Sequence, residues 1–463
     1  MTNNALIQLP KIFPPLDPDF RPAALGHRMF IKRAKATKQA VPARLALEQA
    51  DGSVFHFNTF LFTEDKPEAA GNFFHIERLV KFLLWSRGGF RVYFDGPAAL
   101  GALLQKYFRE TATGKFDADT MGEKIYSKPF EVVLTKDIPA ARASTTPLGR
   151  HLNGCRIGFD LGASDRKAAA VMDGKVVFSE ETVWNPVPQS DPQWHFDQIM
   201  DSLKQAAKHL PRVDAIGGSS AGVYVNNRVR VASLFRGVPA ASAQRVADIF
   251  LELKAAWKNI PFEVVNDGEV TALAGSMALE DNAVLGIAMG SSQAAGFVTP
   301  EGNITSWLNE LAFAPIDYNP GAPKDEWSGD RGCGVQYFSQ QAVGRLLKPA
   351  GIECPADEPL PEKLKRVQRL MEAGDARAQK IYETIGVYLG YGTAHCANFY
   401  DFKHVLVLGR VTTGHGGEII VQRAQEVLRA EFPALAKKTR FDMPDEKEKR
   451  HGQAIAAASL PAI

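Results

Sequence analysis

Two short glycine-containing turns, each between two apolar strand-like runs, constrain the fold more than any other feature of this sequence. The first turn is Asp160–Lys167, at the end of the run Arg156–Asp160, and the second is Gly290–Gly296, after Val284–Met289. The two turns lie about 130 residues apart, and a repeated unit of this kind indicates two related halves. We therefore expect an α/β fold of two lobes with a cleft between them. A Rossmann or P-loop fold is disfavoured, because neither GxGxxG nor GxxxxGK[ST] occurs.

The length of the chain predicts more than these two lobes. At 463 residues it exceeds the size at which a single hydrophobic core keeps growing. The expected parts are an extended arm at 1–27, an α/β module of unknown role at 28–150, a first lobe at 151–280 and a second lobe at 281–463. Within the module, strand-like runs such as 44–47 and 90–94 alternate with helical apolar spacing at 74–86. We find no motif for chemistry in the module.

Charge and cysteine usage argue against several classes of protein. The formal net charge of +2 gives no electrostatic reason to expect nucleic acid or an anionic membrane as a partner. The four cysteines are scattered without CxxC spacing, which favours neither a disulfide framework nor a zinc knuckle. The first 20 residues do not resemble a secretory signal, and no apolar run approaches the roughly 18 residues of a membrane span. We therefore expect a cytoplasmic protein.

The two turns carry residues suited to binding phosphate. In the first, Gly162 and Ala163 let backbone N–H groups approach an anion, Ser164 offers a hydroxyl, and Asp160 can hold Mg²⁺. The second turn, Gly290–Ser292, could do the same from the opposite lobe. Each turn alone is more simply interpreted as a tight β-turn. Two such turns in this order favour a phosphate clamp.

An Asn-Asp pair lies between these turns, at the end of a predicted strand and the start of a predicted helix. The carboxylate of Asp267 could accept a hydroxyl proton as general base, and the amide of Asn266 could position the same substrate. The alternative is an ordinary helix N-cap, which Asn and Asp commonly form. Because phosphate-type turns flank the pair in sequence, we favour catalysis.

The roles of two further loops stay open. Gly409 and Arg410 follow a late apolar strand, and such a glycine turn can lie against an adenine ring or simply connect a strand to a helix. Asp325, Asp330 and Arg331 form a charged cluster in a loop rich in Gly and Pro. We interpret that loop as a solvated lid, with substrate contact as the less favoured alternative.

In this order, these segments resemble the ROK family of sugar kinases and sugar-responsive regulators, within the actin and hexokinase superfamily. The resemblance covers about residues 157–458 and includes 218–231, which corresponds to a loop shaping the sugar pocket. Gly332–Ser339 also looks like the family signature Gly-Cys-Leu-Glu-Ala-Tyr-x-Ser. The resemblance implies a two-lobed, actin-like (ribonuclease H-like) ATPase fold, to which this chain adds the N-terminal α/β module.

The resemblance also implies an activity and a set of site residues. It implies ATP- and Mg²⁺-dependent phosphorylation of a hydroxyl on a sugar or sugar-like polyol by a homodimer, with Asp267 as general base and Asp160 on Mg²⁺, directly or through water. The implied substrate-binding residues are Asn266, Glu310, Ser219, Asn227 and Gln336. The implied ATP- and phosphate-binding residues are Asp160, Gly162, Ala163, Ser164, Lys167, Gly290, Ser291, Ser292, Gly409 and Arg410.

The chain departs from the family at the sugar and zinc positions. The usual Glu-x-Gly-His is Glu310-Leu311-Ala312-Phe313 here, so the histidine is replaced by Phe313. Of the zinc-binding cysteines only Cys333 is present, and the sequence therefore predicts no zinc. Ser292 and Ala294 replace glycines near the phosphates. These differences describe a divergent member without the zinc motif.

Two other functions are compatible with the same resemblance. The first is a non-catalytic sugar or nucleotide sensor, including a regulator that acts through protein contacts. DNA binding is disfavoured, because the N-terminal region lacks a short basic helix pair. The second is an ATPase-like scaffold whose N-terminal module binds a partner. Sugar-independent ATP turnover would favour the scaffold.

Overall fold

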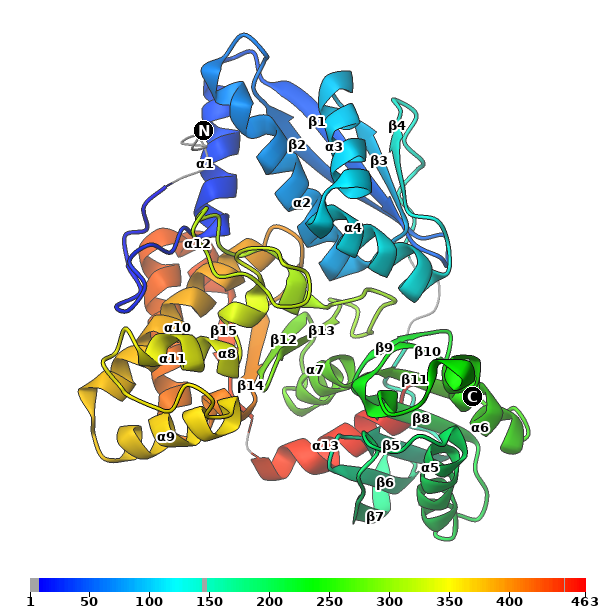
Figure 1. Cartoon of the computed structure of the whole chain (residues 1–463). Helices are drawn as coiled ribbons and strands as arrows, with labels where there is room; N and C mark the ends of the chain where they lie inside the picture. Colours follow the sequence, from blue (N-terminus) through cyan, green and yellow to red (C-terminus); the bar gives the residue numbers. More distant parts are fainter. Residues whose placement is uncertain (1–7, 144–147, 445) are drawn as a thin grey trace.

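The computed structural model describes residues 8–143, 148–444 and 446–463, with side chains at 445–451 left aside. Three α/β parts are visible, namely an N-terminal module and two lobes, each built on its own sheet (Figure 1). The first seven residues of the predicted arm lie outside the described residues. None of the described helices is both long and apolar enough to cross a membrane.

The N-terminal module is a four-stranded sheet with helices α2, α3 and α4 in front of it in Figure 1. The strand order is β2-β1-β3-β4, in which β1 pairs antiparallel with β2 and β3, and β4 runs parallel to β3. Its elements are α1 (Ala23–Ala36), β1 (Val41–Glu48), β2 (Val54–Leu61), the 3₁₀ helix η2 (Pro67–Gly71), α2 (Asn72–Arg87), β3 (Arg91–Asp95), α3 (Ala98–Glu110), α4 (Ala112–Asp119), the π-helical η3 (Thr120–Tyr126) and β4 (Glu131–Leu134).

The extended arm is shorter than the predicted range 1–27, because α1 already begins at Ala23. The described part of the arm packs on the second lobe. The backbone N–H of Ile12 donates to the hydroxyl of Tyr391, at 3.4 Å, and that of Leu16 donates to Thr384 Oγ1, at 3.2 Å. Phe20 is completely buried beside Tyr388 and Tyr391. An arm with these contacts stabilises the second lobe.

The first lobe has a five-stranded sheet in the order β11-β8-β5-β6-β7. Strands β5, β6 and β7 are antiparallel, and β8 and β11 run parallel to β5. An Asp173-Gly174 turn joins β6 to β7, and both of its residues have the positive φ angles (48° and 78°) that such a turn requires. The elements are β5 (Cys155–Leu161), β6 (Asp165–Met172), β7 (Lys175–Val183), α5 (Pro192–Ala207), β8 (Ala215–Ser220), β9 (Val223–Val225), β10 (Arg228–Val231), the 3₁₀ turns η4 (Ser233–Phe235) and η5 (Ala240–Ser242), α6 (Ala243–Ala256), β11 (Phe262–Asn266) and α7 (Asp267–Ala278).

The second lobe repeats most of that arrangement. Its order β13-β12-β14-β15 places an antiparallel hairpin beside two parallel strands, as in β6-β5-β8-β11. The expectation of two related lobes is therefore confirmed. The elements are β12 (Val284–Met289), β13 (Gln293–Val298), η6 (Leu311–Phe313), η7 (Gly334–Gln336), α8 (Gln340–Leu347), α9 (Leu360–Glu372), α10 (Ala376–Cys396), β14 (His404–Leu408), η8 (Arg410–Thr412), α11 (His415–Glu431), α12 (Pro433–Lys438), β15 (Arg440–Asp442) and α13 (Glu446–Ala458).

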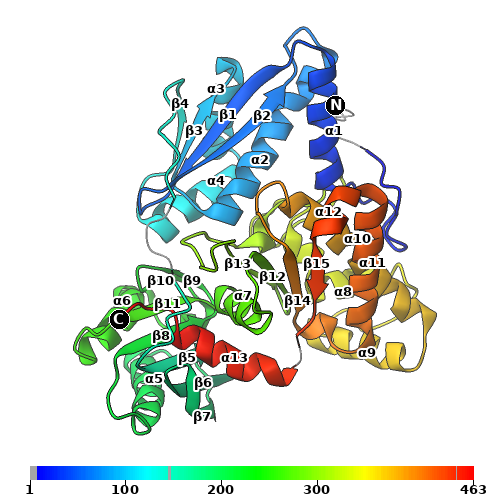
Figure 2. The same cartoon turned by 180° about the vertical axis from the view of Figure 1, so that it is seen from behind.

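The last helix returns to the first lobe, so the range 281–463 is not a single lobe. Helix α13 packs against β5 and α7, as the view from behind shows (Figure 2). Two glycines of the first sheet make this contact possible. A Cβ at Gly158 would lie 2.1 Å from the carbonyl oxygen of Ala454, and one at Gly217 would lie 1.8 Å from that of Ala457. Only glycine lets the helix backbone approach the strands so closely.

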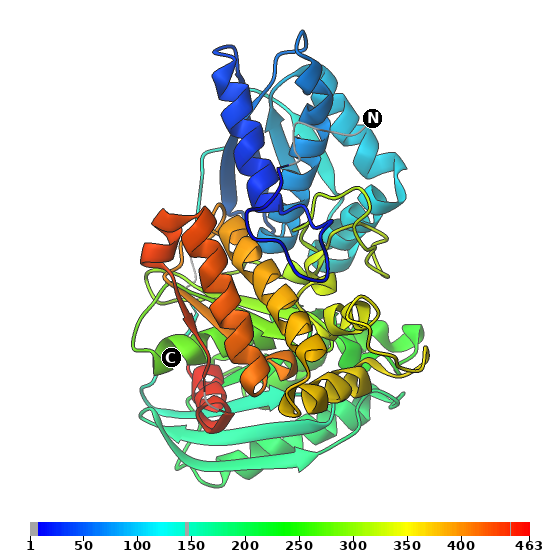
Figure 3. The same ribbon diagram turned by 90° about the vertical axis from the view of Figure 1, so that its left-hand side faces the viewer.

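The hydrophobic cores show which parts pack together. One continuous core includes Leu47 and Phe82 of the module together with Ile287 and Tyr388 of the second lobe. The first lobe has a separate core around Phe159. In side view the module lies on the second lobe, and the first lobe is at the opposite end of the molecule (Figure 3). A third core joins α7 and α13 to the sheet of the second lobe. A cleft lined by Gln49 of the module, Asn266 of the first lobe and Trp307 of the second lobe lies where the three parts meet.

Candidate active site

Three acidic side chains from both lobes approach one another at this cleft. Asp160 lies on β5, Asp267 is the first residue of α7, and Glu310 immediately precedes η6. Burial, and then the negative charge of Asp160, raise the pKa of Asp267 to about 6. Burial, and then the charge of Asp267, raise the pKa of Glu310 to about 7. The charge of Asp160 thus acts on Asp267, and that of Asp267 acts on Glu310.

Asp267 is positioned by the start of helix α7. Strand β11 ends at Asn266, whose side-chain oxygen accepts a hydrogen bond from the N–H of Gly268, at 2.7 Å. Thr271 Oγ1 donates to the carbonyl oxygen of Asp267, also at 2.7 Å, which secures the first turn. Asn266 Nδ2 donates to the carbonyl of Gly222, at 2.7 Å. The capping interpretation of Asn266 is therefore confirmed, and its substrate contact stays a prediction.

Asp160 has partners within the first lobe. Lys167 is opposite it on β6, with Nζ 3.6 Å from Asp160 Oδ2 and 3.1 Å from Asp165 Oδ1. Burial raises the pKa of Asp160, while a hydrogen bond from Ser219 and the charge of Lys167 oppose this shift. Ser219, predicted to bind substrate, is thus buried on β8 against Asp160. The structure places Asp160, Lys167 and Ser219 in one group.

The acidic cluster is suited to a divalent cation. Within the described ranges, no three His, Cys, Asp or Glu side chains are grouped as metal ligands. Mg²⁺ does not need such a set, because it commonly uses one or two carboxylates together with water and phosphate oxygens. Burial raises the pKa of Asp160, and a cation there would stabilise its ionised form. Asp160 therefore fits the predicted Mg²⁺.

The loop that carries Glu310 is held by three parts of the molecule. The N–H groups of Leu308 and Asn309 donate to the carbonyl oxygens of Arg87 and Ser86 at the end of α2, each at 3.0 Å. Asn309 Nδ2 donates to the carboxylate of Glu269, and Asn309 Oδ1 accepts from the Tyr400 hydroxyl, at 2.7 Å. The N-terminal module thus helps to position Glu310.

Sequence reasoning missed Glu269 and Asn309. Glu269 is buried, and burial raises its pKa to about 8 although the hydrogen bond from Asn309 opposes the shift. The only signal for Glu269 was its place two residues after Asp267 in the same helix. Asn309 adopts a positive φ of 50°, which Asn tolerates better than most residues. Its position beside Glu310 was visible in the sequence, but its partners were not.

The two predicted phosphate turns lie in hairpins of opposite lobes. In the first, the N–H of Gly162 donates to the carbonyl of Asp165, at 2.9 Å, and Ser164 Oγ donates to Asp165 Oδ2, at 2.9 Å. In the second, the N–H of Gly290 donates to the carbonyl of Ser292, at 2.9 Å. The residues of the turns that face solvent are Ala163, Ser164, Ser291 and Ser292. Their contact with phosphate stays a prediction.

Two residues predicted to bind substrate form hydrogen bonds within the fold. Asn227 Nδ2 donates to the carbonyl of Phe262, at 2.8 Å, and its Oδ1 accepts from the N–H of Val264, at 2.7 Å. It ties the loop between β9 and β10 to β11. Gln336 lies in η7, where its amide donates to Gln341. Both side chains are buried, and these bonds account for them structurally.

The glycine turn predicted to lie against adenine has a packing explanation. Gly409 has a φ of 102°, and a Cβ there would lie 2.5 Å from the carbonyl oxygen of Met289. The ends of β12 and β14 therefore require glycine at this position. Arg410 is exposed at the start of η8, and its carbonyl accepts a hydrogen bond from Gln368 Nε2, at 3.0 Å. Contact of either residue with a nucleotide stays a prediction.

The interpretation of the charged loop around Asp330 as a solvated lid is wrong. Asp325 and Asp330 are buried, and Asp330 Oδ2 lies 3.0 Å from Arg78 Nη2 and 2.9 Å from Lys81 Nζ. Both cations are on α2 of the N-terminal module. The module covers the loop and neutralises its charge. Arg331 is exposed, as predicted, and its Nη1 donates to the carbonyl of Ala322, at 3.0 Å.

Comparison with known proteins supports the same fold. No protein-family model matches the sequence, and no curated protein matches it. Among solved structures, a ROK hexokinase from Thermus thermophilus is similar at 18% identity and a TM-score of 0.51, covering 65% of this chain and 97% of that chain. A ROK family transcriptional regulator, described as a homolog of the E. coli MLC protein, is similar at 18% identity and a TM-score of 0.51. The match covers 67% of this chain and 79% of the regulator. The chain therefore has the two-lobed, actin-like fold of the ROK proteins, as the sequence predicted.

Proposed function

We propose that this protein is an ATP-dependent kinase for a hydroxyl of a sugar or sugar-like polyol. The observation that carries the proposal is the placement of Asp267 at the start of α7, between Asp160 of one lobe and Glu310 of the other. A pKa of about 6 leaves Asp267 ionised at neutral pH but still able to hold a proton. A general base works best when its pKa lies near the operating pH. The fold, similar to that of a ROK hexokinase, is consistent with this chemistry.

The reaction needs positioning more than covalent chemistry from the protein. Asp267 accepts the proton of the acceptor hydroxyl at a carboxylate oxygen, while Glu310 accepts a hydrogen bond from a neighbouring hydroxyl. The acceptor oxygen forms a bond to the γ-phosphorus of ATP, and the bond from that phosphorus to the bridging oxygen breaks, which releases ADP. The exposed residues of the turns at 162–164 and 290–292 would hold the phosphates from the two lobes.

Asp160 would hold Mg²⁺ beside the phosphates, directly or through water. When bound, the ion neutralises the negative charge of the phosphate oxygens. Lys167, 3.6 Å from Asp160, keeps that carboxylate oriented. Movement of the first lobe toward the second lobe and module would exclude water, which otherwise competes as an acceptor.

The test is Asp267→Asn, which preserves the shape of the side chain and removes the base. With Mg·ATP and a panel of hexoses, N-acetylhexosamines and cyclitols, we expect kcat to fall about 10²–10⁴-fold for the accepted sugar. The wild-type rate should also fall as the pH drops below about 6, because Asp267 becomes protonated. Glu280→Gln, exposed at the far end of α7, is the matched control. Unchanged phosphorylation by Asp267→Asn would refute the mechanism.

A sugar or nucleotide sensor is the second candidate. Its support is the equal similarity of the fold to a ROK family transcriptional regulator, together with Phe313 at the position where the family has a histidine. The sensor binds sugars without consuming ATP. Thermal-shift measurements with the same panel separate the two, since a ligand at about 100 times its Kd stabilises a fold by roughly 2.7 kcal/mol. Stabilisation by a sugar without ADP release would favour the sensor.

A further inference from the structure

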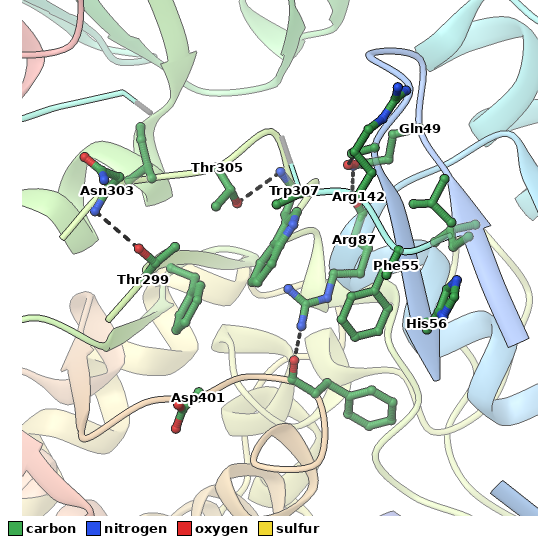
Figure 4. Close-up of a pocket in the computed structure, with 18 of the residues that line it drawn as sticks. Gln49, Phe55, His56, Arg87, Arg142, Thr299, Asn303, Thr305, Trp307 and Asp401 are labelled. Carbon is green, nitrogen blue, oxygen red and sulfur yellow. Dashed lines mark hydrogen bonds between the residues drawn. The ribbon is translucent and has the colours of Figure 1, made fainter. Parts of the chain in front are cut away.

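A large cavity lies between the N-terminal module and the second lobe, apart from the acidic cluster (Figure 4). Its volume is about 830 Å³, which is in the range of small-molecule sites. The module contributes the β1–β2 hairpin, the end of α2 and the chain at 141–143 to the cavity wall. The second lobe contributes the chain from β13 to Trp307 and the residues before β14. Much of the wall is apolar or aromatic, including Phe55, Phe297, Trp307 and Phe399.

Arg87, the last residue of α2, supplies the buried charge of this cavity. Only 2% of the residue is exposed. Its Cζ lies 3.2 Å from the ring centre of Trp307 and 4.3 Å from that of Phe55, so aromatic faces enclose the guanidinium. One nitrogen, Nη2, donates to the carbonyl of Phe399, whereas Nε and Nη1 have no hydrogen-bond partner. Figure 4 shows the guanidinium between Trp307 and Phe55 in the centre of the cavity.

A buried cation without a countercharge is energetically costly. Among the described residues, no carboxylate influences the charge of Arg87, and each unsatisfied buried donor costs about 1–3 kcal/mol. Burial lowers the pKa of Arg87 to about 10, which still leaves it charged at neutral pH. The other described ionisable residues of the lining are all exposed: His56, Arg142, Glu301 and Asp401. Solvent screens these four, so the unbalanced charge inside the cavity is positive.

We propose that this cavity binds a small organic anion, with the acidic group on Arg87 and an apolar body against Phe55, Phe297 and Trp307. An oxygen of a carboxylate or phosphate would accept the hydrogen bonds that Nη1 and Nε do not make, after a small rotation of the guanidinium. Hydrogen bonds between ionised groups are the strong ones. The aromatic walls provide the area that a ring or chain of the ligand would bury. This site adds to the proposed kinase function and does not depend on it.

The cavity is connected to the acidic cluster through the backbone. Trp307, which touches Arg87, is three residues before Glu310. The carbonyl of Arg87 itself accepts from Leu308, and Gln49 Nε2 donates both to that carbonyl and to the carbonyl of Ser306, the latter at 3.1 Å. These contacts are the route by which a ligand on Arg87 would influence the chain that carries Glu310. The ligand would act as an effector of the sugar site, an extension that rests on the proposed function.

Binding is tested on the full chain with three probes of similar size, without ATP or sugar. Benzoate and phenyl phosphate carry the two anionic groups on a ring, and benzyl alcohol is the neutral control. We expect at least one anion to bind about tenfold or more tightly than benzyl alcohol by titration calorimetry, and the stronger anion identifies the acidic group. Equal binding of anions and alcohol, or no binding of either anion at millimolar concentration, would overturn the proposal.

Two substitutions place the probe in the cavity. Arg87→Met should weaken binding of the anion about tenfold or more, while Arg142→Met, a charge loss at the exposed rim, should leave it within about twofold. If Arg87→Met does not fold, Trp307→Phe keeps an aromatic wall and removes the nearby fluorophore. Quenching by the bound anion in wild type should then disappear in Trp307→Phe. Wild-type affinity in Arg87→Met, or unchanged quenching in Trp307→Phe, would place the probe elsewhere and overturn the assignment.

The effector role has its own measurement. The Kd of the sugar that stabilises the protein is determined with and without saturating anion, and we expect a change of about threefold or more in either direction. An unchanged Kd with the anion bound would refute the coupling and leave the binding site standing. Failure of the kinase proposal would appear instead as absence of ADP release, so the two outcomes are distinguishable.

Discussion

The molecule contains two clusters of buried charge that follow opposite rules. In the cleft, Asp160, Asp267 and Glu310 are like charges, and burial together with mutual repulsion raises the pKa of Asp267 and Glu310. Under the module, opposite charges alternate. Burial alone would raise the pKa of Asp330, but Arg78 and Lys81 hold it well below its usual range. The second cluster is neutralised within the fold, and the first is not.

The difference separates a structural role from a functional one. Paired charges with short hydrogen bonds, such as Lys81 between Asp117 and Asp330, hold the module on the second lobe. Charges left without a counterion destabilise the empty protein and are retained where a ligand supplies the missing charge. Arg87 resembles the cleft carboxylates in lacking a counterion, but its charge is positive, so the ligand that we propose for it is an anion.

The largest effect on stability is expected from breaking the paired cluster. Lys81→Met removes the cation that lies 3.0 Å from Asp117 and 2.9 Å from Asp330, and leaves both carboxylates buried. We expect the free energy of unfolding, measured by urea denaturation, to fall by about 3–5 kcal/mol. Lys106→Met is the control, because its pair with Glu110 in the same module is exposed, and it should cost less than about 0.5 kcal/mol. Equal losses of stability in Lys81→Met and Lys106→Met would show that the buried cluster is not a special source of stability.

A substitution at Glu310 in the cleft is expected to have a smaller effect on the free energy of unfolding, and one of opposite sign. The pKa of Glu310 is about 7 in the folded protein against an ordinary 4.5, so the folded state binds more protons between these values. Its contribution to stability is present below about pH 4.5 and is lost as the pH rises through 7. Glu310→Gln should therefore stabilise the apo protein at pH 8 by about 1–3 kcal/mol, and have little effect at pH 4.

The measurement for Glu310→Gln is urea denaturation at both pH values. Glu301→Gln, at an exposed glutamate in the same loop region, is the matched control. Its effect on the free energy of unfolding should be the same at both pH values. The same Glu310→Gln protein should bind sugar less tightly if Glu310 contacts the substrate. A variant that is less stable than wild type at pH 8 would show that Glu310 has a favourable partner in the fold.

The lobes were predictable because their signals are local. The apolar run before each turn, the small residues in it and the Asp173-Gly174 pair determine hairpins within a few residues of sequence. The place of Asp267 in the fold was predictable for the same reason, since the end of a strand and the start of a helix meet at one dipeptide.

The contacts across the parts of the chain were not predictable. The partners of Asp330 come from helix α2, about 250 residues earlier, and nothing in the loop itself distinguishes a buried aspartate from a solvated one. Arg87 directly follows the predicted helical segment 74–86, and a basic residue at a helix C-terminus is a common surface feature. Its burial results from Trp307 and Phe399 of the second lobe. Long-range packing of this kind leaves no periodic signal in the sequence.

The smallest expected effect concerns Asn266, where the structure assigns a capping role beside the predicted substrate contact. Asn266→Ala removes both the cap on Gly268 and the hydrogen bond to Gly222, and should lower the free energy of unfolding by about 1–2 kcal/mol. Asn266→Ser keeps a good capping oxygen but cannot reach Gly222, and should cost about half as much. Urea denaturation of both variants, beside sugar titration, separates the roles. If both variants keep wild-type stability and lose only sugar binding, Asn266 acts on the ligand together with Asp267, and its hydrogen bonds within the fold contribute little to stability.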